Sequence, residues 1–450
     1  MVFKRCAAVF IFLLLITTLF AQEVSERQEV AVFSVSHYGY DVKGGSSFVD
    51  RINARILDVF EGLGRFDIIG SNYAISQSDV NAFIEQIREV REQDVELPEE
   101  VLLGHETFTE ADFNALVGSF IVVVPSLIHF NSAWNSDLEA YEAELELEFT
   151  FINVQDIETV GHILLEESAT GDSEQEATEN VVNSFQNELQ YEVRSLEPFR
   201  LRTGIVEVLA SGQVIMQFGR DMGVNVGDEY VISETRILNS GHQMSGETGL
   251  VMITEVSDQV SVGRVLYSQG RPEIGAQLEE VPRLGFETIP YAHMIIPGVI
   301  PDNSGFMLGF RTNYIGGGFI DFKPMVGFEV PLTSGFNNIH GIPANVYAGA
   351  EYDFLNLGRL QMNAIGHVTV GGLIPLDSSS SDSKKTSESD ESFYLSHVGF
   401  AAQAGINYLF SRDFRFSVEA GYVFMIAAAS EYVASSYQGL YGGVGISYRY

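Results

Sequence analysis

Residues that could carry out chemistry are few in this sequence, and their surroundings argue against catalysis. Ser381 and Lys384 have the S-x-x-K spacing of a nucleophile and its base, but they lie in a serine-rich stretch that offers no rigid placement. His105 and Glu106 lack the second histidine of the zinc motif H-E-x-x-H. Residues 43–46 lack the spacing of a phosphate-binding loop. We therefore expect no catalytic residue, no metal ion and no cofactor, and a protein that is not an enzyme.

The chain is strongly acidic, with 61 Asp and Glu against 25 Lys and Arg and a formal net charge of -36. Binding to nucleic acid needs a basic surface that neutralises phosphates, so we exclude nucleic acid as a partner. Residues 137–197 hold 17 acidic residues and one basic residue, Arg194. A solvated sheet face explains them most simply, and a docking face for a basic partner or for divalent ions is the alternative. A salt-rich habitat would also explain the acidity of the whole chain.

Residues 1–21 have the composition of a secretory signal peptide. Lys4 and Arg5 give the positive start, and residues 7–20 form an apolar stretch that is short for a membrane helix. Cys6, the only cysteine, precedes this stretch, whereas the cysteine of a lipoprotein must follow it, so we expect no lipid anchor. The alternative is an N-terminal membrane anchor. Cleavage after Ala21 would leave a mature chain without disulfides or thiolate metal sites.

The last third of the chain alternates apolar and polar residues, which is the pattern of β-strands with two different faces. In the final segment Val444, Ile446, Tyr448 and Tyr450 share one face, and small or polar residues fill the other. A strand of this kind that ends in an aromatic residue is typical of the closing strand of an outer-membrane barrel. We predict eight antiparallel strands over residues 286–296, 306–314, 320–332, 346–354, 360–370, 400–410, 414–424 and 440–450.

The polar faces of the predicted strands carry charged residues, which suit a narrow lumen better than a packed core. We expect charge pairs there among Arg311, Glu329, Glu351, Arg415 and Glu419. Eight strands enclose a space just wide enough for side chains, so we favour a plugged barrel over an open pore. A soluble β-sandwich or lipocalin-like barrel, with its apolar face turned inward, is the alternative.

The lengths of the connections indicate how the barrel is oriented. Residues 411–413 form a tight turn, typical of the periplasmic end, and residues 376–392 form a long serine-rich segment, typical of the extracellular end. The segment 286–296 is the weakest strand because Pro290 lies inside it. We include it because an eighth strand returns the start of the barrel to the periplasm. No later stretch has about 18 consecutive apolar residues, so we expect no membrane-spanning helix.

A chain of 450 residues is too long for one core, and the sequence divides into several domains. Residues 22–197 predict an α/β domain with strands over 30–35, 66–69, 120–130, 139–154 and 157–166, helices over 46–63, 77–92 and 173–195, and a short helix after Thr109. Residues 198–282 hold short β segments with glycine turns, which predict a small β-barrel domain. The expected domains are therefore a signal peptide (1–21), an α/β domain (22–197), a small β-barrel (198–282) and an outer-membrane β-barrel (283–450).

The glycine turns give the middle of the chain a resemblance to a known family. The residues that carry it are 219–230, Val262, Gly263, Arg264, Val265, Ile274 and Gly275. They look like the C-terminal domain of the flagellar assembly protein T family. The preceding α/β unit resembles domains shared with the curli-secretion outer-membrane lipoprotein family and the amino-terminal domain of the Tol translocation protein B. The resemblance implies envelope assembly or scaffolding rather than catalysis, although we expect this chain, unlike those families, to lack a lipid anchor and to carry its own barrel.

Together these patterns predict a non-enzymatic protein of the bacterial outer membrane whose N-terminal domains lie in the periplasm. Its expected partners are outer-membrane lipid, the barrel-insertion machinery, and a periplasmic envelope protein or cell-wall component. Two alternatives stay open. The barrel could conduct, as a small channel or transport protein, or the chain could be a surface adhesin that acts through residues 376–392.

Overall fold

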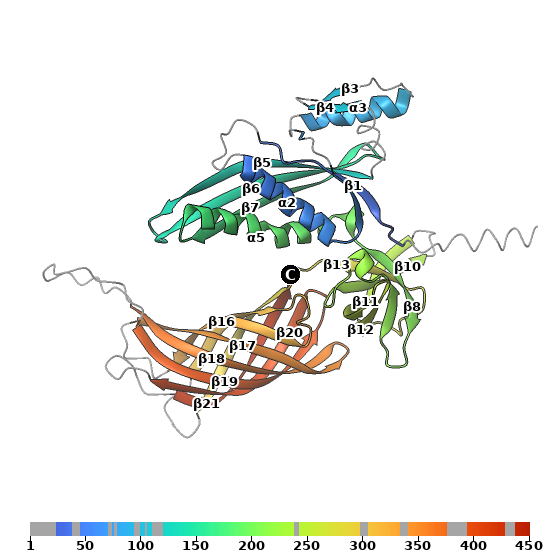
Figure 1. Ribbon diagram of the computed structural model, residues 1–450. Helices are drawn as coiled ribbons and strands as arrows, with labels where there is room; N and C mark the ends of the chain where they lie inside the picture. Colours follow the sequence, from blue (N-terminus) through green and yellow to red (C-terminus); the bar gives the residue numbers. More distant parts are fainter. Residues whose placement is uncertain are drawn as a thin grey trace, which may run out of the picture.

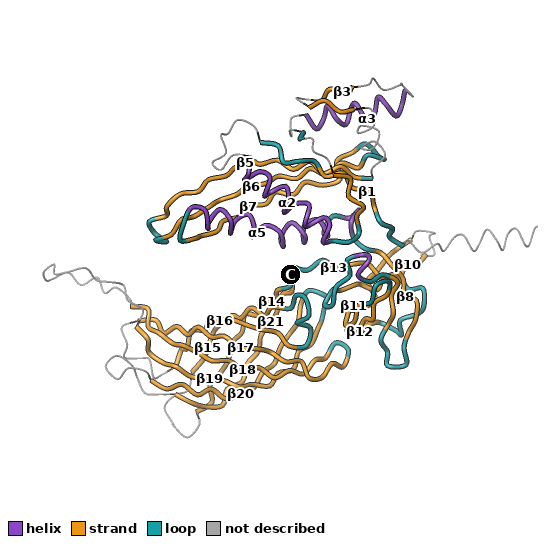
Figure 2. Tube along the Cα trace, viewed as in Figure 1, coloured by secondary structure: helices purple, strands orange, loops and turns teal. Residues whose placement is uncertain are grey.

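The computed structural model describes residues 24–37, 46–70, 74–75, 79–93, 100–103, 106–109, 120–237, 243–297, 305–333, 341–375, 394–427 and 437–450. They form an α/β unit, a closed barrel of six strands and a closed barrel of eight strands (Figure 1). Figure 2 shows that helices are confined almost entirely to the α/β unit. The multidomain fold class predicted from the sequence is confirmed. The predicted signal peptide, the S-x-x-K pair, His105 and the serine-rich segment lie outside the described residues.

A five-stranded sheet in the order β2-β1-β5-β6-β7 forms the frame of the α/β unit. Its strands are β1 (Gln28–Val32), β2 (Phe66–Gly70), β5 (Ile121–Asn135), β6 (Ala140–Asn153) and β7 (Glu158–Gly171). β1 runs parallel to β2 and β5, and β5, β6 and β7 form an antiparallel meander. β5 is central because residues 121–124 are apolar and fully buried on both of its faces.

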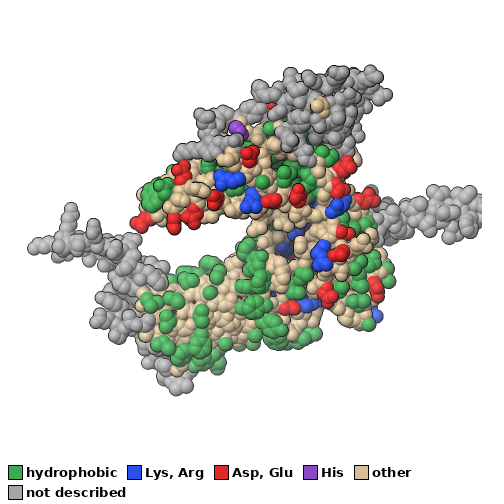
Figure 3. Space-filling view, in the orientation of Figure 1, with side chains coloured by type: hydrophobic (Ala, Val, Ile, Leu, Met, Phe, Trp, Pro, Cys, Tyr) green, Lys and Arg blue, Asp and Glu red, His purple; other side chains and the backbone are tan. Residues whose placement is uncertain are grey.

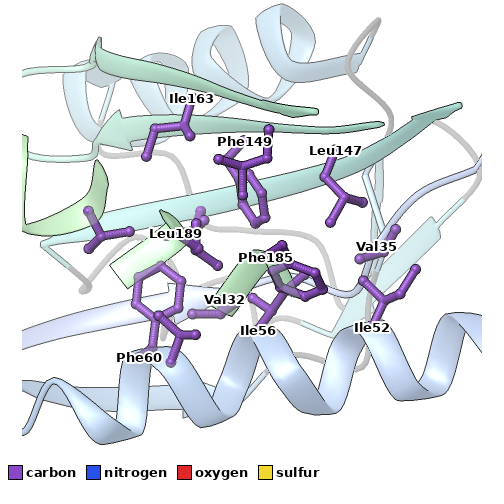
Figure 4. Close-up of a cluster of buried hydrophobic side chains, with 14 of the residues drawn as sticks. Val32, Val35, Ile52, Ile56, Phe60, Leu147, Phe149, Ile163, Phe185 and Leu189 are labelled. Carbon is purple, nitrogen blue, oxygen red and sulfur yellow. The ribbon is translucent and has the colours of Figure 1, made fainter. Parts of the chain in front are cut away.

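Helices α2 (Ser46–Gly62) and α5 (Glu174–Ser195) bury their apolar sides against one face of this sheet. Phe60 of α2 and Phe185 of α5 meet Phe149 of β6 in this core (Figure 4). Helix α5 begins where the sequence predicts, because the side chain of Ser173 accepts a hydrogen bond of 3.2 Å from the backbone N–H of Glu176.

The opposite face of the sheet is covered in part. Helix α3 (Val80–Gln93) places Phe83 edge-on against Phe33. Four glutamates of β6 lie on this face at alternate positions and are exposed or half-exposed: Glu142, Glu144, Glu146 and Glu148. The hairpin of β3 (Glu100–Leu103) and β4 (Glu106–Thr109) was not predicted, because four-residue strands are too short to show alternation. The short helix expected after Thr109 falls on residues 110–119, outside the described chain.

The six-stranded barrel closes in the order β10-β11-β12-β9-β8-β13. Its strands are β8 (Arg202–Val208), β9 (Val214–Gln217), β10 (Glu229–Ile237), β11 (Gln243–Val256), β12 (Val260–Ser268) and β13 (Gln277–Val281). Ile205, Met216, Val251 and Leu278 fill its interior. The glycine-rich stretch before β10 forms the 3-10 helix η4 (Arg220–Met222), which ends at Gly223.

The eight-stranded barrel closes because β14 pairs with β21. Its strands are β14 (Phe286–Pro297), β15 (Gly305–Tyr314), β16 (Phe322–Thr333), β17 (Gly341–Leu357), β18 (Leu360–Pro375), β19 (Tyr394–Leu409), β20 (Phe414–Ala427) and β21 (Tyr437–Arg449). All neighbouring pairs are antiparallel. Pro290 is tolerated inside β14 although it has no N–H to donate to the ladder. Among the described helices, none has the length and apolar composition to cross a membrane.

Candidate functional site

The outer wall of the eight-stranded barrel is apolar. Leu308, Phe310, Val444, Ile446 and Tyr448 each expose between 46% and 52% of their surface. Figure 3 shows apolar side chains spread over the visible face of this wall. Eight charged side chains of the same strands are instead buried in the lumen: Glu287, Arg311, Lys323, Glu329, Glu351, Asp353, Arg415 and Glu419. This inverted arrangement is typical of transmembrane β-barrels, and the soluble-barrel alternative, which predicts the reverse, is wrong.

The closing strand β21 turns Val444, Ile446 and Tyr448 outward, as alternation along a strand requires. Tyr450 follows the strand by one residue and lies at the seam of the barrel, where its hydroxyl is 2.6 Å from the hydroxyl of Thr288 on β14. Backbone hydrogen bonds between Phe286 and Tyr450 continue the same seam. The C-terminal aromatic residue therefore helps to join the first and last strands.

Arg311 and Glu419 form the central ion pair of the lumen. The Arg311 guanidinium donates to both carboxylate oxygens of Glu419, with an Nη1–Oε2 distance of 3.0 Å. Its Nη2 also lies 3.8 Å from a carboxylate oxygen of Glu351. His293 adds a contact of 3.2 Å from its Nε2 to Glu419. The charge of Glu419 is thus compensated inside the lumen, as a buried carboxylate requires.

A second set of ion pairs lies nearer the six-stranded barrel. Arg415 bonds to Glu287 and lies 3.4 Å from Glu351. The Nζ of Lys323 lies 3.2 Å from Glu351 and 2.6 Å from Asp353. Arg415 and Glu351 were predicted from the sequence as pairing residues, whereas Glu287, Lys323 and Asp353 were not. These three occupy the same inward-facing positions of their strands, so the alternation itself could have identified them.

Glu329 lies in the lumen but is bonded by neutral groups. Its carboxylate accepts hydrogen bonds of 3.0 Å from the Tyr291 hydroxyl and 2.9 Å from the Asn345 amide. The Tyr291 hydroxyl is also 2.9 Å from that of Tyr347. The expected charge pair at this position is therefore replaced by a hydrogen-bonded cluster of polar and aromatic side chains.

Side chains fill the middle of the lumen. The space left among Tyr291, Arg311, Tyr347, His367 and Tyr441 is about 10 Å³. That is about the room that one water molecule needs. A cavity of about 330 Å³ opens instead at the end of the barrel next to the six-stranded barrel and helix α5. The described part of the barrel is thus filled at its middle and hollow at this mouth.

Buried ion pairs join the six-stranded barrel to this mouth of the large barrel. Arg283, in the segment between the two barrels, donates to Glu229 of β10 at 3.1 Å and to Asp413 at 2.7 Å. Arg449 of β21 bonds to the same Glu229. Burial alone would raise the pKa of Glu229, but the charges of Arg449 and Arg283 hold it below its ordinary value. Leu409 of β19 adds an apolar contact, because it packs in one cluster with six residues of the six-stranded barrel.

Glu280 joins the α/β unit to the six-stranded barrel. Its buried carboxylate accepts hydrogen bonds from Arg65 at 2.6 and 3.1 Å, from Arg194 at 2.7 Å and from the backbone N–H of Leu201 at 3.1 Å. Burial alone would raise its pKa, but the charges of Arg65 and Arg194, with these hydrogen bonds, lower it to about 2. Four donors on one carboxylate hold these two parts in a defined orientation.

Two glycines allow the same parts to touch through their backbones. A Cβ at Gly223 would stand 1.8 Å from the carbonyl oxygen of Leu63, and one at Gly64 would stand 2.8 Å from the backbone nitrogen of Gly223. Gly223 also has a φ of 73°, which favours glycine. This contact gives a physical reason for a glycine in the stretch 219–230, which carries the resemblance predicted from the sequence.

We expect the stability of the protein to depend on pH through Glu280. Its folded pKa of about 2 lies below the ordinary 4.5, so its contribution is present above pH 4.5 and is lost as the pH falls from there towards 2. Glu280→Gln should lower the free energy of unfolding by roughly 3 kcal/mol at pH 7 and flatten this acid limb. Urea unfolding between pH 7 and pH 3 measures both, with the partly exposed neighbour Glu279→Gln as control. An acid limb that is unchanged in Glu280→Gln would contradict this role.

No protein-family model matches the sequence, and no curated protein matches it. Neisserial surface protein A is 15% identical, with a TM-score of 0.28, over 37% of this chain and 97% of its own. The N-terminal β-barrel domain of Pseudomonas aeruginosa OprF is 11% identical, with a TM-score of 0.24, over 37% and 96%. PelC of Paraburkholderia phytofirmans, solved as a dodecamer, is 15% identical, with a TM-score of 0.20, over 37% and 90%. The resemblance to flagellar assembly protein T stays a prediction.

Proposed function

We propose that this chain is an outer-membrane protein whose barrel is a closed anchor and whose two other parts form a periplasmic unit for envelope assembly or scaffolding. The observation that carries the proposal is the filled lumen inside an apolar wall. An apolar wall suits contact with lipid, and ion-paired side chains inside a narrow barrel leave no continuous water path. The role is structural, so no step of catalysis is assigned to any residue.

The connections between the parts support a scaffolding role. Glu280 and Glu229 each form ion pairs with two arginines, and these pairs cross a boundary between two parts of the chain. A third cross-boundary pair joins Arg264 of β12 to Asp321, beside β16, at 2.8 Å. Because these pairs are buried or half-buried, they resist screening by salt better than surface pairs do. A membrane anchor linked in this way would present the α/β unit at a fixed distance and angle from the bilayer.

The partner of this scaffold is proposed to be a periplasmic envelope protein or a cell-wall component. The resemblance of residues 219–230 to a flagellar assembly domain supports this class of partner. The acidic face of β6 supplies a candidate surface for a basic partner. Outer-membrane lipid and the barrel-insertion machinery are the further partners that a transmembrane barrel requires.

Conductance distinguishes the closed anchor from a channel. In planar lipid bilayers the full-length protein should insert without steady ion current, because Arg311, Glu419 and the aromatic cluster around Tyr291 block the lumen. As a control, the double variant Tyr291→Ala with Tyr347→Ala should remove part of this block and admit measurable current. Steady, voltage-independent current through the unmodified protein would overturn the anchor and favour the transport alternative.

A further inference from the structure

Strand β7 forms an open edge of the five-stranded sheet (Figure 1). It is 14 residues long, and among the described residues it pairs with β6 alone. A free edge presents a row of unpaired backbone N–H and C=O groups, which is a template for a further strand. Proteins commonly protect such an edge by shortening it, covering it, or placing lysine or proline on it. β7 is long and contains neither lysine nor proline.

The hydrogen bonds of the neighbouring strands show which residues of β7 turn their backbone outward. The N–H of Val154 at the end of β6 bonds to the carbonyl of Phe120 beside β5, so odd-numbered residues of β6 face β7. From residue 161 to residue 171, β7 pairs odd positions with odd positions of β6, so its even-numbered residues turn outward. The carbonyl of Thr170 agrees, because Asn180 of α5 donates to it at 2.9 Å. The outward residues whose backbone is reached by no hydrogen bond from another described residue are Leu164, Glu166 and Ser168.

The side chains along this edge are acidic. Glu166 of β7 lies directly opposite Glu146 of β6, and Glu144 and Glu148 occupy the neighbouring positions of the same face. None of these four glutamates forms an ion pair within the described part of the chain. Like charges directly opposite each other destabilise a sheet, so positive charge brought to this face would stabilise it.

This charge decides which kind of strand fits the edge. Pairing of two copies of the chain through β7 would bring Glu166 and Glu167 of both copies together, which disfavours a second copy. A segment with lysine or arginine at alternate positions would instead place positive charge beside Glu166. It would lie about 10 Å from β6, twice the spacing of neighbouring strands, which two long charged side chains can span. Leu164, which is 54% exposed, adds an apolar contact next to Glu166.

We propose that the outer edge of β7 takes up an extended, lysine- or arginine-rich segment of a partner protein as a sixth strand of the sheet. Backbone hydrogen bonds along residues 164–168 hold the segment, and Glu166 with the glutamates of β6 selects its positive side chains. The inference rests on the proposed scaffolding role and deepens it, because it makes the partner a protein rather than a cell-wall component.

The test uses the full-length protein in detergent micelles and measures the binding of dye-labelled peptides by fluorescence anisotropy. The probe is a short peptide in which lysine alternates with threonine, a residue that favours strands. Two control peptides each change one property. One has glutamate in place of lysine, and the other keeps lysine but carries methyl groups on its backbone nitrogens, which removes the donors that a sheet needs. The lysine probe should bind, and neither control peptide should.

Variants of the edge separate a sixth strand from attraction by charge alone. Ser168→Pro removes an outward N–H and should weaken the lysine probe about tenfold. The fold should tolerate this proline, because the N–H of Ser168 does not bond to β6. Ser168→Ala keeps the N–H and should leave the affinity unchanged. Glu166→Gln should also weaken the probe, whereas Glu207→Gln, at an exposed position of the small barrel, should not.

Three results would overturn the sixth-strand site: no binding of the lysine probe, equal binding of its N-methylated form, or equal affinity in Ser168→Pro and Ser168→Ala. If Ser168→Pro fails to fold, the comparison of the two lysine peptides still decides, because it needs only the unmodified protein. Bilayer conductance tests the closed anchor separately. A conducting protein that still bound the lysine probe would therefore refute the anchor and keep this site.

Discussion

Replacing Arg311 with methionine should destabilise the large barrel by about 3–5 kcal/mol. Arg311 is almost fully buried and compensates Glu419 directly and Glu351 at longer range. Removing the guanidinium leaves two buried carboxylates without their nearest common cation, and that cost exceeds the net value of the original pair. Urea unfolding of the full-length protein in lipid vesicles, followed by the electrophoretic mobility of the folded barrel, measures the change.

Two controls separate this charge effect from a general loss of packing. Leu308→Met changes an outward-facing side chain of the same strand and should alter the free energy of unfolding by less than about 0.5 kcal/mol. Glu419→Gln combined with Arg311→Met removes one of the uncompensated charges and should recover about half of the loss. A single Arg311→Met variant within 1 kcal/mol of the parent would mean that the lumen pairs do not carry the stability of the barrel.

The large barrel was predictable because period-two alternation records which face of each strand meets lipid. All eight predicted segments overlap the observed strands, including β14 with its internal proline. The small barrel and the α/β unit were predictable for similar reasons, since glycine turns and a capped helix leave local signals. Alternation predicts only which face of a strand a residue occupies. That face alone was enough to place four residues in the lumen: Arg311, Glu351, Glu419 and Arg415.

The partners of those residues were not predictable, because pairing depends on register and on contacts far apart in the sequence. Glu329 points into the lumen as expected, yet Tyr291 and Asn345 reach it rather than an arginine. Glu280 bonds to Arg65 across 215 positions, and Arg449 bonds to Glu229 across 220. No local pattern in a single sequence marks such pairs. The two junctions that support the scaffold proposal therefore emerged only from the structure.

The substitution Val444→Arg should destabilise the barrel by about 2–4 kcal/mol in a bilayer. Val444 lies near the middle of β21, is about half exposed, and is paired with Ala292 and Val418 on the flanking strands. In water such a position would accept arginine at little cost, because the side chain can extend into solvent. In lipid the charge must be pulled to the interface or dehydrated, so the cost arises only if the wall faces hydrocarbon. Val444→Leu, which keeps the side chain apolar, should cost less than about 0.5 kcal/mol.

The most direct test compares Val444→Arg with Val206→Arg in the full-length protein folded in lipid vesicles. Val206 lies on β8 of the small barrel and exposes 46% of its surface, against 48% for Val444, so the two positions differ chiefly in what surrounds them. If the apolar wall is the lipid-facing surface of an outer-membrane barrel, Val444→Arg lowers the free energy of unfolding by about 2–4 kcal/mol and Val206→Arg by less than about 0.5 kcal/mol. Small and equal losses at both positions would place the wall in water and contradict the membrane assignment.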